Sequence, residues 1–113
     1  MLLNWQEFLA ATMEAFRNLG KGNSELTRSV VSLASAGAKG TLDEKTKELI
    51  SLAVAVTSRC DGCIAIHTSA AVKAGATRQE VLETLSVAVA MNAGAATVYS
   101  GKVLEAYDQF SVK

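Results

Sequence analysis

Proline is absent from this chain of 113 residues, and runs of alternating β-branched and polar residues bounded by turns are also missing. Proline interrupts helices, so its absence, together with abundant alanine, favours helical structure. The strands of a half-exposed sheet would need the alternation that is missing. We therefore expect an all-α fold and no sheet.

The chain also has no net charge, because 11 Lys and Arg residues balance 11 Asp and Glu residues. Aromatic residues are few, at 5% of the sequence, and basic residues interleaved with aromatic residues do not cluster anywhere. Such clusters are typical of nucleic-acid interfaces. We expect no nucleic-acid partner.

Long uninterrupted apolar runs are missing as well. Asn4, Gln6 and Glu7 break the apolar start before a signal-peptide core can form, and charged or polar residues interrupt the later runs. We therefore expect a cytoplasmic protein without membrane contact. Half of the residues are apolar, and the length suits one hydrophobic core, so residues 1–113 are predicted to form a single domain.

Apolar residues recur at helical spacing in six segments, which predicts a compact helical domain of about six helices. The small residues around Asn92 and Gly94 predict a bend or break between the last two. The first helix and the last two carry more apolar surface than a monomer of this size can bury, which predicts a homo-oligomer. The predicted helices cover approximately residues 4–19, 24–40, 42–57, 58–74, 77–91 and 98–110.

Both cysteines and the only histidine lie close together, as Cys60, Cys63 and His67. The apolar runs on either side are helical, so the Cys-x-x-Cys pair lies at the turn of a central antiparallel helix hairpin. A helix N-terminus stabilises a thiolate, and two cysteines at this spacing can form a disulfide. Such a small loop hardly restrains an unfolded chain. A reactive dithiol is therefore the better interpretation.

The hairpin also predicts a proton pathway. His67 lies four residues after Cys63, hence one helical turn further along the same face. At a rise of about 1.5 Å per residue, Glu48 on the opposite helix and His67 lie at similar heights above the turn. The remaining distance can be spanned by the Glu48 side chain or by one bridging water. We predict a relay that runs from Glu48 through His67 and Cys63 to Cys60.

These residues have the spacing E-x(11)-C-x-x-C-x(3)-H and are followed by Ala-Gly-Ala-Thr at positions 74–77. The pattern resembles the alkyl hydroperoxidase D family, part of the carboxymuconolactone decarboxylase-like superfamily. The resemblance implies an all-helical subunit in trimers or hexamers that needs no cofactor, and a lipoylated protein or a peroxiredoxin as redox partner. It also implies that Cys63 attacks the peroxide, Cys60 resolves the product, and Glu48 and His67 relay protons.

One position departs from this family, because Gly62 stands where well-described members have a histidine directly before the second cysteine. Dithiol–disulfide exchange does not need that imidazole. The resemblance implies, however, that efficient peroxide reduction depends on it. The main prediction is therefore a thiol-dependent oxidoreductase that reduces a peroxide or a disulfide without a metal.

Other interpretations of the same residues stay open. The thiols could be structural, or could lock a helical oligomerisation or binding module. Cys60, Cys63, His67 and Glu48 satisfy the ligand count of a zinc site, although structural zinc sites usually have more cysteines. A decarboxylase-like activity belongs to the same superfamily, but those enzymes lack the cysteine pair. A c-type haem would need histidine at Ile64, and a thioredoxin fold would need strands.

Overall fold

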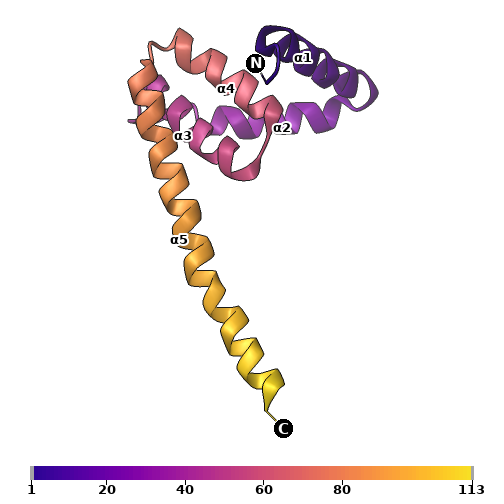
Figure 1. Cartoon of the computed structure of the whole chain (residues 1–113). Coiled ribbons are helices and arrows are strands. Elements are labelled where there is room, and N and C mark those ends of the chain that lie inside the picture. The colour runs from indigo at the N-terminus through magenta and orange to yellow at the C-terminus, as the bar shows by residue number, and fades with distance from the viewer. Residues whose placement is uncertain (1, 113) are drawn as a thin grey trace.

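The computed structural model describes residues 2–112, and every regular element in this range is a helix (Figure 1). This confirms the predicted all-α class. The count differs slightly, since five helices form instead of six. They are α1 (Trp5–Gly22), α2 (Ser24–Ala36), α3 (Glu44–Ser58), α4 (Asp61–Lys73) and α5 (Arg78–Ser111).

The α3–α4 hairpin is the centre of the structure. The helix α3 packs against α4 on one side and the beginning of α5 on the other, while α1 packs against both α2 and α4. The buried core of this arrangement is made almost entirely of small side chains, which let the helix axes approach closely. Its members are Leu52 and Ala55 from α3, Ala65 and Ala71 from α4, and Ala88 from α5.

Polar side chains begin the helices largely where the sequence indicates. Asn23 caps α2 and Thr77 caps α5, the latter with the reciprocal Glu80 bond of a capping box. Two predicted starts shift slightly along the chain. The helix α3 begins at Glu44 instead of residue 42, with Asp43 as its cap accepting the N–H of Thr46 at 2.8 Å, and α4 begins at Asp61 instead of residue 58.

The predicted break between the last two helices is wrong, because α5 continues without interruption through Asn92 and Gly94. The Asn92 side chain donates to the carbonyl of Ala88 at 2.7 Å and to Thr57 Oγ1 of α3 at 3.0 Å. These bonds tie the amide to its own helix and to α3. A glycine within a helix costs only about 1 kcal/mol, so Gly94 alone does not end it.

The second half of α5 projects away from the other helices, and the molecule measures 59 × 39 × 36 Å (Figure 1). By length and composition alone, α5 could cross a membrane, since one 18-residue window has a mean hydropathy of 1.4 and is 6% buried. This differs from the expectation that every apolar run is interrupted too early. The expected absence of membrane contact stays a prediction.

An ion pair joins the starts of α3 and α5. Lys45 Nζ lies 2.8 Å from Glu80 Oε2, and the other carboxylate oxygen of Glu80 accepts the N–H of Thr77 at 2.9 Å. The hydrogen bond that Glu80 accepts from Lys45, followed by its hydrogen bonds with the backbone and side chain of Thr77, lowers the pKa of Glu80 from 4.5 to about 2. Glu80 therefore contributes to stability mainly in its ionised form.

This pair predicts an acid-dependent loss of stability. Because the folded pKa lies below the unfolded one, ionised Glu80 stabilises the fold above the unfolded pKa of 4.5, and this contribution disappears as the pH falls toward 2. We expect Glu80→Gln to lower the thermal midpoint at neutral pH and to flatten its decline over this acid range. Glu83→Gln on the same helix is the control. Equal profiles for the two variants would contradict the assignment.

The helix α1 meets α4 at Gly62, close to the cysteine pair. A Cβ atom at Gly62 would lie 3.1 Å from Cγ2 of Thr12, closer than ordinary van der Waals contact. The Thr12 hydroxyl donates to the carbonyl of Phe8 at 2.8 Å, which holds its side chain in place. The absence of a side chain at Gly62 thus allows α1 to pack over the first turn of α4.

This contact predicts a coupling between two substitutions. Gly62→Ala should destabilise the native chain by about 1 kcal/mol, because the added methyl group overpacks against Thr12. In a Thr12→Ser background, which keeps the hydroxyl and removes Cγ2, the same change should be neutral or stabilising. Urea unfolding of the four proteins measures the coupling. Equal effects of Gly62→Ala in both backgrounds would show that the contact does not matter.

Candidate redox site

The turn between α3 and α4 is short and has a defined geometry. Arg59 adopts a left-handed backbone conformation, with φ 55° and ψ 51°. Its N–H donates to the carbonyl of Val56 at 3.3 Å, and the N–H of Cys60 donates to Ala55 at 3.1 Å. These two bonds form a Schellman-type end to α3. The chain then enters α4 directly, with Cys60 as the N-cap residue.

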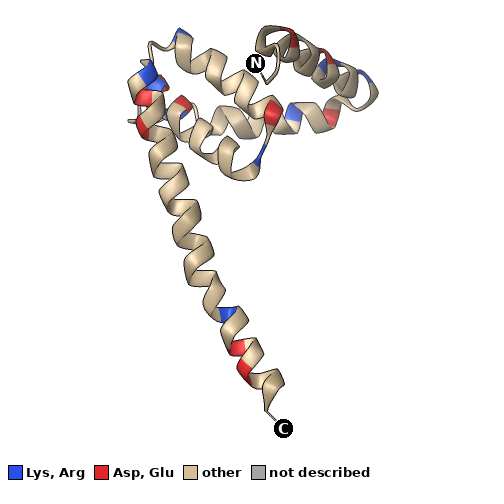
Figure 2. Cartoon of the chain, in the orientation of Figure 1, with Lys and Arg blue, Asp and Glu red and all other residues tan. Residues whose placement is uncertain are grey.

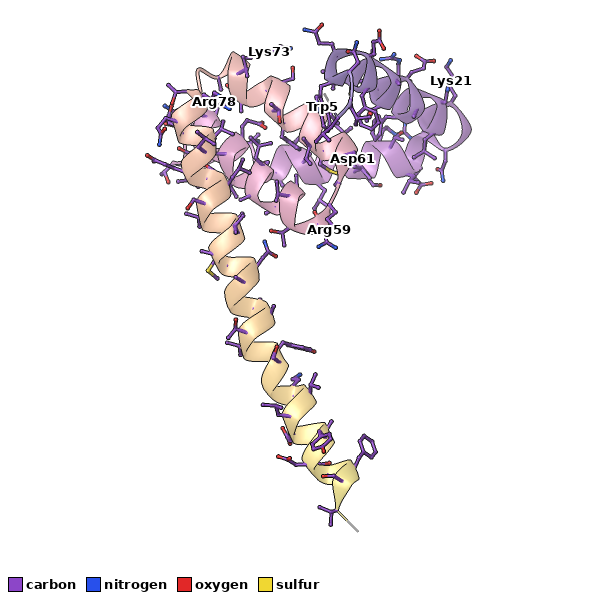
Figure 3. The ribbon with its side chains drawn as sticks, viewed as in Figure 1. Trp5, Lys21, Arg59, Asp61, Lys73 and Arg78 are labelled. Carbon is purple, nitrogen blue, oxygen red and sulfur yellow. A yellow bond between two sulfur atoms is a disulfide. The ribbon has the colours of Figure 1, made fainter. Side chains whose placement is uncertain are left out.

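A disulfide joins Cys60 and Cys63 across the first turn of α4, with their Cα atoms 5.2 Å apart. Figure 3 places this sulfur–sulfur bond at the start of α4, beside Asp61. Cys60 Sγ also accepts the N–H of Cys63 at 3.1 Å, in the position of a helix-capping oxygen. When the bond is reduced, this N–H and the helix dipole stabilise a negative charge on Cys60.

Glu48 and His67 meet across the hairpin, as their spacing predicts. His67 Nδ1 lies 2.7 Å from Glu48 Oε2. The two side chains are only partly exposed, at 34% for His67 and 19% for Glu48. In a neutral imidazole that donates Nδ1–H to the carboxylate, the other ring nitrogen, Nε2, is free to accept a proton. The contact with Glu48 therefore fixes the orientation of the His67 ring.

A hollow of about 510 Å³ opens beside this pair. The end of α2 and the segment before α3 form one wall, while Lys47, Glu48, Ser51 and His67 form the other. Neither cysteine lines it. His67 is thus the side chain that connects the hollow with the helical face on which Cys63 lies. The imidazole is therefore open to solvent on this side.

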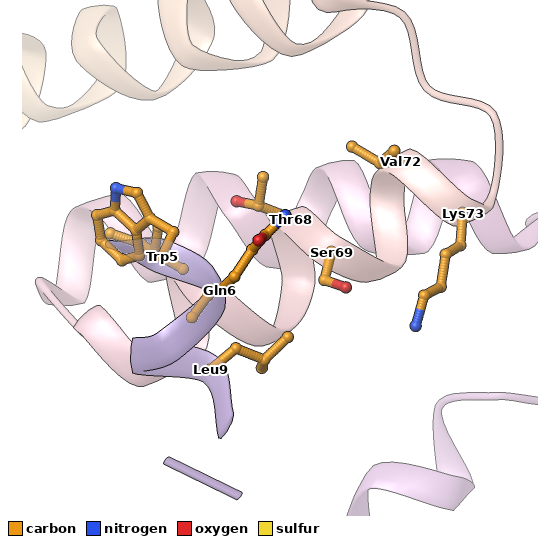
Figure 4. A pocket seen from close by; sticks show the side chains of 9 residues that line it. Trp5, Gln6, Leu9, Thr68, Ser69, Val72 and Lys73 are labelled. Atoms are coloured by element: carbon orange, nitrogen blue, oxygen red, sulfur yellow. The ribbon is translucent and has the colours of Figure 1, made fainter. Parts of the chain in front are cut away.

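A second hollow, of about 530 Å³, lies between α1 and α4 (Figure 4). Trp5, Gln6 and Leu9 of α1 face the α4 side chains, and Lys73 lies near the far end. Ile64, which directly follows Cys63, also lines it. The lining is mainly apolar with a few polar groups, which suits the carbon chain of an organic molecule.

The four residues predicted from the sequence thus form two contacting pairs on one hairpin. Within residues 2–112, no group of three or more His, Cys, Asp or Glu side chains is placed to hold a metal ion. The catalytic roles assigned to the four residues stay predictions. The sequence did not predict that Thr12 and Lys47 border the site. It does not show how α1 crosses α4 or which α3 side chains line the hollow.

Gly62 is explained by the packing of α1. A histidine at this position, which the resemblance would imply, would bring its Cβ atom to 3.1 Å from Cγ2 of Thr12. The methyl group of Thr12 therefore occupies part of the space that such a histidine would need. His67 is the only histidine in the chain.

Two bacterial proteins resemble this chain in sequence. A protein of Haemophilus influenzae described as uncharacterized is 47% identical over 108 residues, which cover 95% of this chain and 96% of that protein. An uncharacterized protein encoded in the cox locus of Paracoccus denitrificans is 42% identical over 72 residues, covering 64% of this chain and 65% of that protein.

A crystal structure resembles the whole chain. It is that of an apo carboxymuconolactone decarboxylase family protein from Legionella pneumophila, with a TM-score of 0.74 and 41% identity. The match covers 96% of this chain and 97% of that one. The family model of the carboxymuconolactone decarboxylase family matches residues 24–106, which include both helices of the hairpin. The chain therefore belongs to the carboxymuconolactone decarboxylase family.

Proposed function

We propose that this chain is a thiol-dependent oxidoreductase that reduces a peroxide or a disulfide with Cys60 and Cys63. The observation that carries the proposal is the hairpin geometry: a cysteine pair at a helix N-terminus, followed one turn later by a histidine that a glutamate orients. This combination has the parts of a nucleophile, a resolving group and a base. Membership of a family that includes enzymes agrees with it.

In the first step, His67 Nε2 takes the proton of Cys63, and the thiolate attacks the terminal oxygen of the hydroperoxide. The sulfur–oxygen bond forms while the oxygen–oxygen bond breaks, and the leaving alkoxide takes the proton back from His67. The products are an alcohol and a sulfenic acid on Cys63. The imidazolium that forms transiently is stabilised by the Glu48 carboxylate at 2.7 Å.

In the second step, the Cys60 thiol attacks the Cys63 sulfur, which expels water and forms the disulfide. One peroxide and two thiols thus give one alcohol, one water molecule and one disulfide. The cysteines together supply two electrons. A separation of 5.2 Å between their Cα atoms already suits this bond, so closure needs no rearrangement of α4.

A dithiol donor then restores the pair. Its thiolate attacks the Cys63 sulfur and expels Cys60 as a thiolate, which the N–H of Cys63 and the helix terminus stabilise. The donor's second thiol displaces Cys63 and leaves as a disulfide. A lipoylated protein in its dithiol form suits this step chemically. In the reverse direction, the reduced cysteine pair could reduce the disulfide of a peroxiredoxin. Cycling of this kind fits the reducing cytoplasm that we expect for the protein.

The structure argues against thiols that only lock an oligomer. The disulfide lies within the first turn of one helix in one chain, so it links no two copies. It also closes a loop too small to stabilise the fold greatly. Steady-state reduction of an organic hydroperoxide with dihydrolipoamide as the donor tests the proposal. Turnover above the rate without protein is expected, and its absence with both hydroperoxide and small disulfide substrates would contradict the function.

Replacing Cys63 and replacing Cys60 should block the reaction at different steps. We expect Cys63→Ser to abolish reduction, whereas Cys60→Ser allows one attack and then traps a sulfenic acid or a mixed disulfide on Cys63. Serine at position 60 still offers an oxygen to the N–H of Cys63, so α4 keeps its cap. Mass spectrometry locates the trapped group. An adduct on Cys60 in Cys63→Ser, and none in Cys60→Ser, would reverse the roles.

Glu48 and His67 should act as one unit. We expect Glu48→Gln and His67→Gln each to slow oxidation of Cys63 by about 10²-fold, the lower range for general base catalysis. The double variant should be little slower than the worse single variant, because both changes disable the same step. His67→Gln should also move the pH profile of Cys63 alkylation to higher pH, measured in a Cys60→Ser background.

Glu44→Gln is the matched control for this series. Glu44 lies one turn before Glu48 and lines the same hollow, but it makes no hydrogen bond to His67. Its substitution should leave both the rate and the alkylation profile unchanged. Additive losses for Glu48→Gln and His67→Gln, with an unchanged profile, would mean that His67 only packs.

A further inference from the structure

Charge is unevenly distributed around the hollow between α1 and α4. Of the side chains that line it in the described part of the chain, only Lys73 is charged. Figure 2 shows charged side chains only at the two ends of α4, which are Asp61 beside the cysteine pair and Lys73 in the last turn. The hollow therefore runs along an uncharged helix face from an acidic end to a basic end.

The cysteine pair lies at the acidic end of this hollow. Cys60 precedes Ile64 by four residues, and Ile64 lines the hollow, so both residues lie on one face of α4. The helices α1 and α4 also meet at this end, where a Cβ atom at Gly62 would lie 3.1 Å from Cγ2 of Thr12. A long molecule in the hollow therefore has one of its ends beside the cysteine pair.

The basic end offers two hydrogen-bond donors without a partner. No carboxylate of residues 2–112 lies within ion-pair distance of Lys73. Ser69 lies one turn before Lys73, and Figure 4 shows both side chains pointing to the same side of α4. The Ser69 hydroxyl makes no hydrogen bond to another described residue, whereas those of Ser51 and Thr57 donate to a carbonyl one turn earlier. An ammonium group and a free hydroxyl at this spacing suit a carboxylate.

Between these two ends the hollow suits a hydrocarbon chain. Its volume of about 530 Å³ is that of a pocket for a small organic molecule. Trp5 and Val72, which line it, are 36% and 66% exposed, and Leu9 lies between the two helices with them. A bound chain would cover these apolar side chains, and the removal of apolar surface from water favours binding.

We propose that this hollow binds the hydroperoxide of a long-chain fatty acid, with the carboxylate at Ser69 and Lys73 and the hydroperoxide at the cysteine pair. Ser69 and Lys73 follow Cys63 by six and ten residues, hence by about 9 and 15 Å along α4. An extended chain of about eight to twelve carbons spans this length, as in a fatty acid oxidised near its middle. Asp61 opposes the reverse orientation, because its charge repels a carboxylate.

This substrate assignment rests on the proposed redox function. The Cys63 thiolate takes the terminal oxygen of the fatty acid hydroperoxide, and the oxygen that stays on the carbon chain is protonated to a hydroxyl group. Cys60 then attacks the sulfenic acid on Cys63, which expels water and forms the disulfide. Two thiols and one fatty acid hydroperoxide give one hydroxy fatty acid, one water molecule and one disulfide.

The first test measures binding without redox chemistry. Trp5 is the only tryptophan and lines the hollow, so its fluorescence reports an occupant. We expect linoleate, titrated into the native chain below its micelle concentration, to change this fluorescence saturably, and methyl linoleate to bind about tenfold more weakly because it lacks the charge. Lys73→Gln should weaken linoleate binding by a similar factor. Lys21→Gln, an exposed lysine at the other end of α1, is the control.

The second test measures the reduction of hydroperoxides. We expect Lys73→Gln to raise KM for linoleic acid hydroperoxide about tenfold while leaving kcat nearly unchanged, because the carboxylate lies far from the reacting oxygen. The same variant should leave the constants for the methyl ester hydroperoxide unchanged. Reduction of cumene hydroperoxide, which has neither a long chain nor a carboxylate, tests the redox function separately.

Several results would overturn the assignment. Equal affinities of the native chain for linoleate and methyl linoleate would exclude the carboxylate site without the need for any variant. Equal effects of Lys73→Gln and Lys21→Gln would exclude Lys73 as its anchor. Turnover of cumene hydroperoxide without saturable linoleate binding would overturn this inference and leave the redox function standing. Linoleate binding without turnover of any hydroperoxide or disulfide would instead overturn the redox function, and with it the substrate assignment.

Discussion

The left-handed backbone of Arg59 fixes the turn on which the candidate site depends. This conformation costs a residue with a side chain about 1–2 kcal/mol, and here it lets one helix end and the next begin almost at once. Cys60 consequently occupies the N-terminus of α4, where backbone N–H groups are unpaired by the helix. The same turn sets the register of the hairpin and brings Glu48 to His67.

The close approach of α3 and α4 explains the composition of the core. Buried positions on the two helices are alanines and one leucine, so the hairpin gains tightness from small side chains rather than from large ones. Such a core leaves many large apolar residues outside. Those near α1 line a hollow beside Cys63, and those along α5 extend away from the site. The apolar surface along α5 is therefore separate from the surface beside the cysteine pair.

Local signals in the sequence were enough for the hairpin and for the pairing of Glu48 with His67. Both follow from helical periodicity and from counting residues on each side of one turn. The continuity of α5 was not predictable in this way, because Asn92 is held by Thr57, a residue far away in the sequence. The contact between Gly62 and Thr12 was hidden for the same reason, since it depends on how α1 crosses α4.

The central claim is that folding activates the Cys60–Cys63 disulfide, and its rate of reduction by dihydrolipoamide tests this most directly. The rate should be measured at one pH for the native chain and for the same chain unfolded in urea, with a model disulfide correcting for the solvent. A structural disulfide is protected by burial, whereas a catalytic one benefits from a stabilised leaving thiolate. We predict faster reduction in the folded chain. Slower reduction there than in the unfolded chain would contradict it.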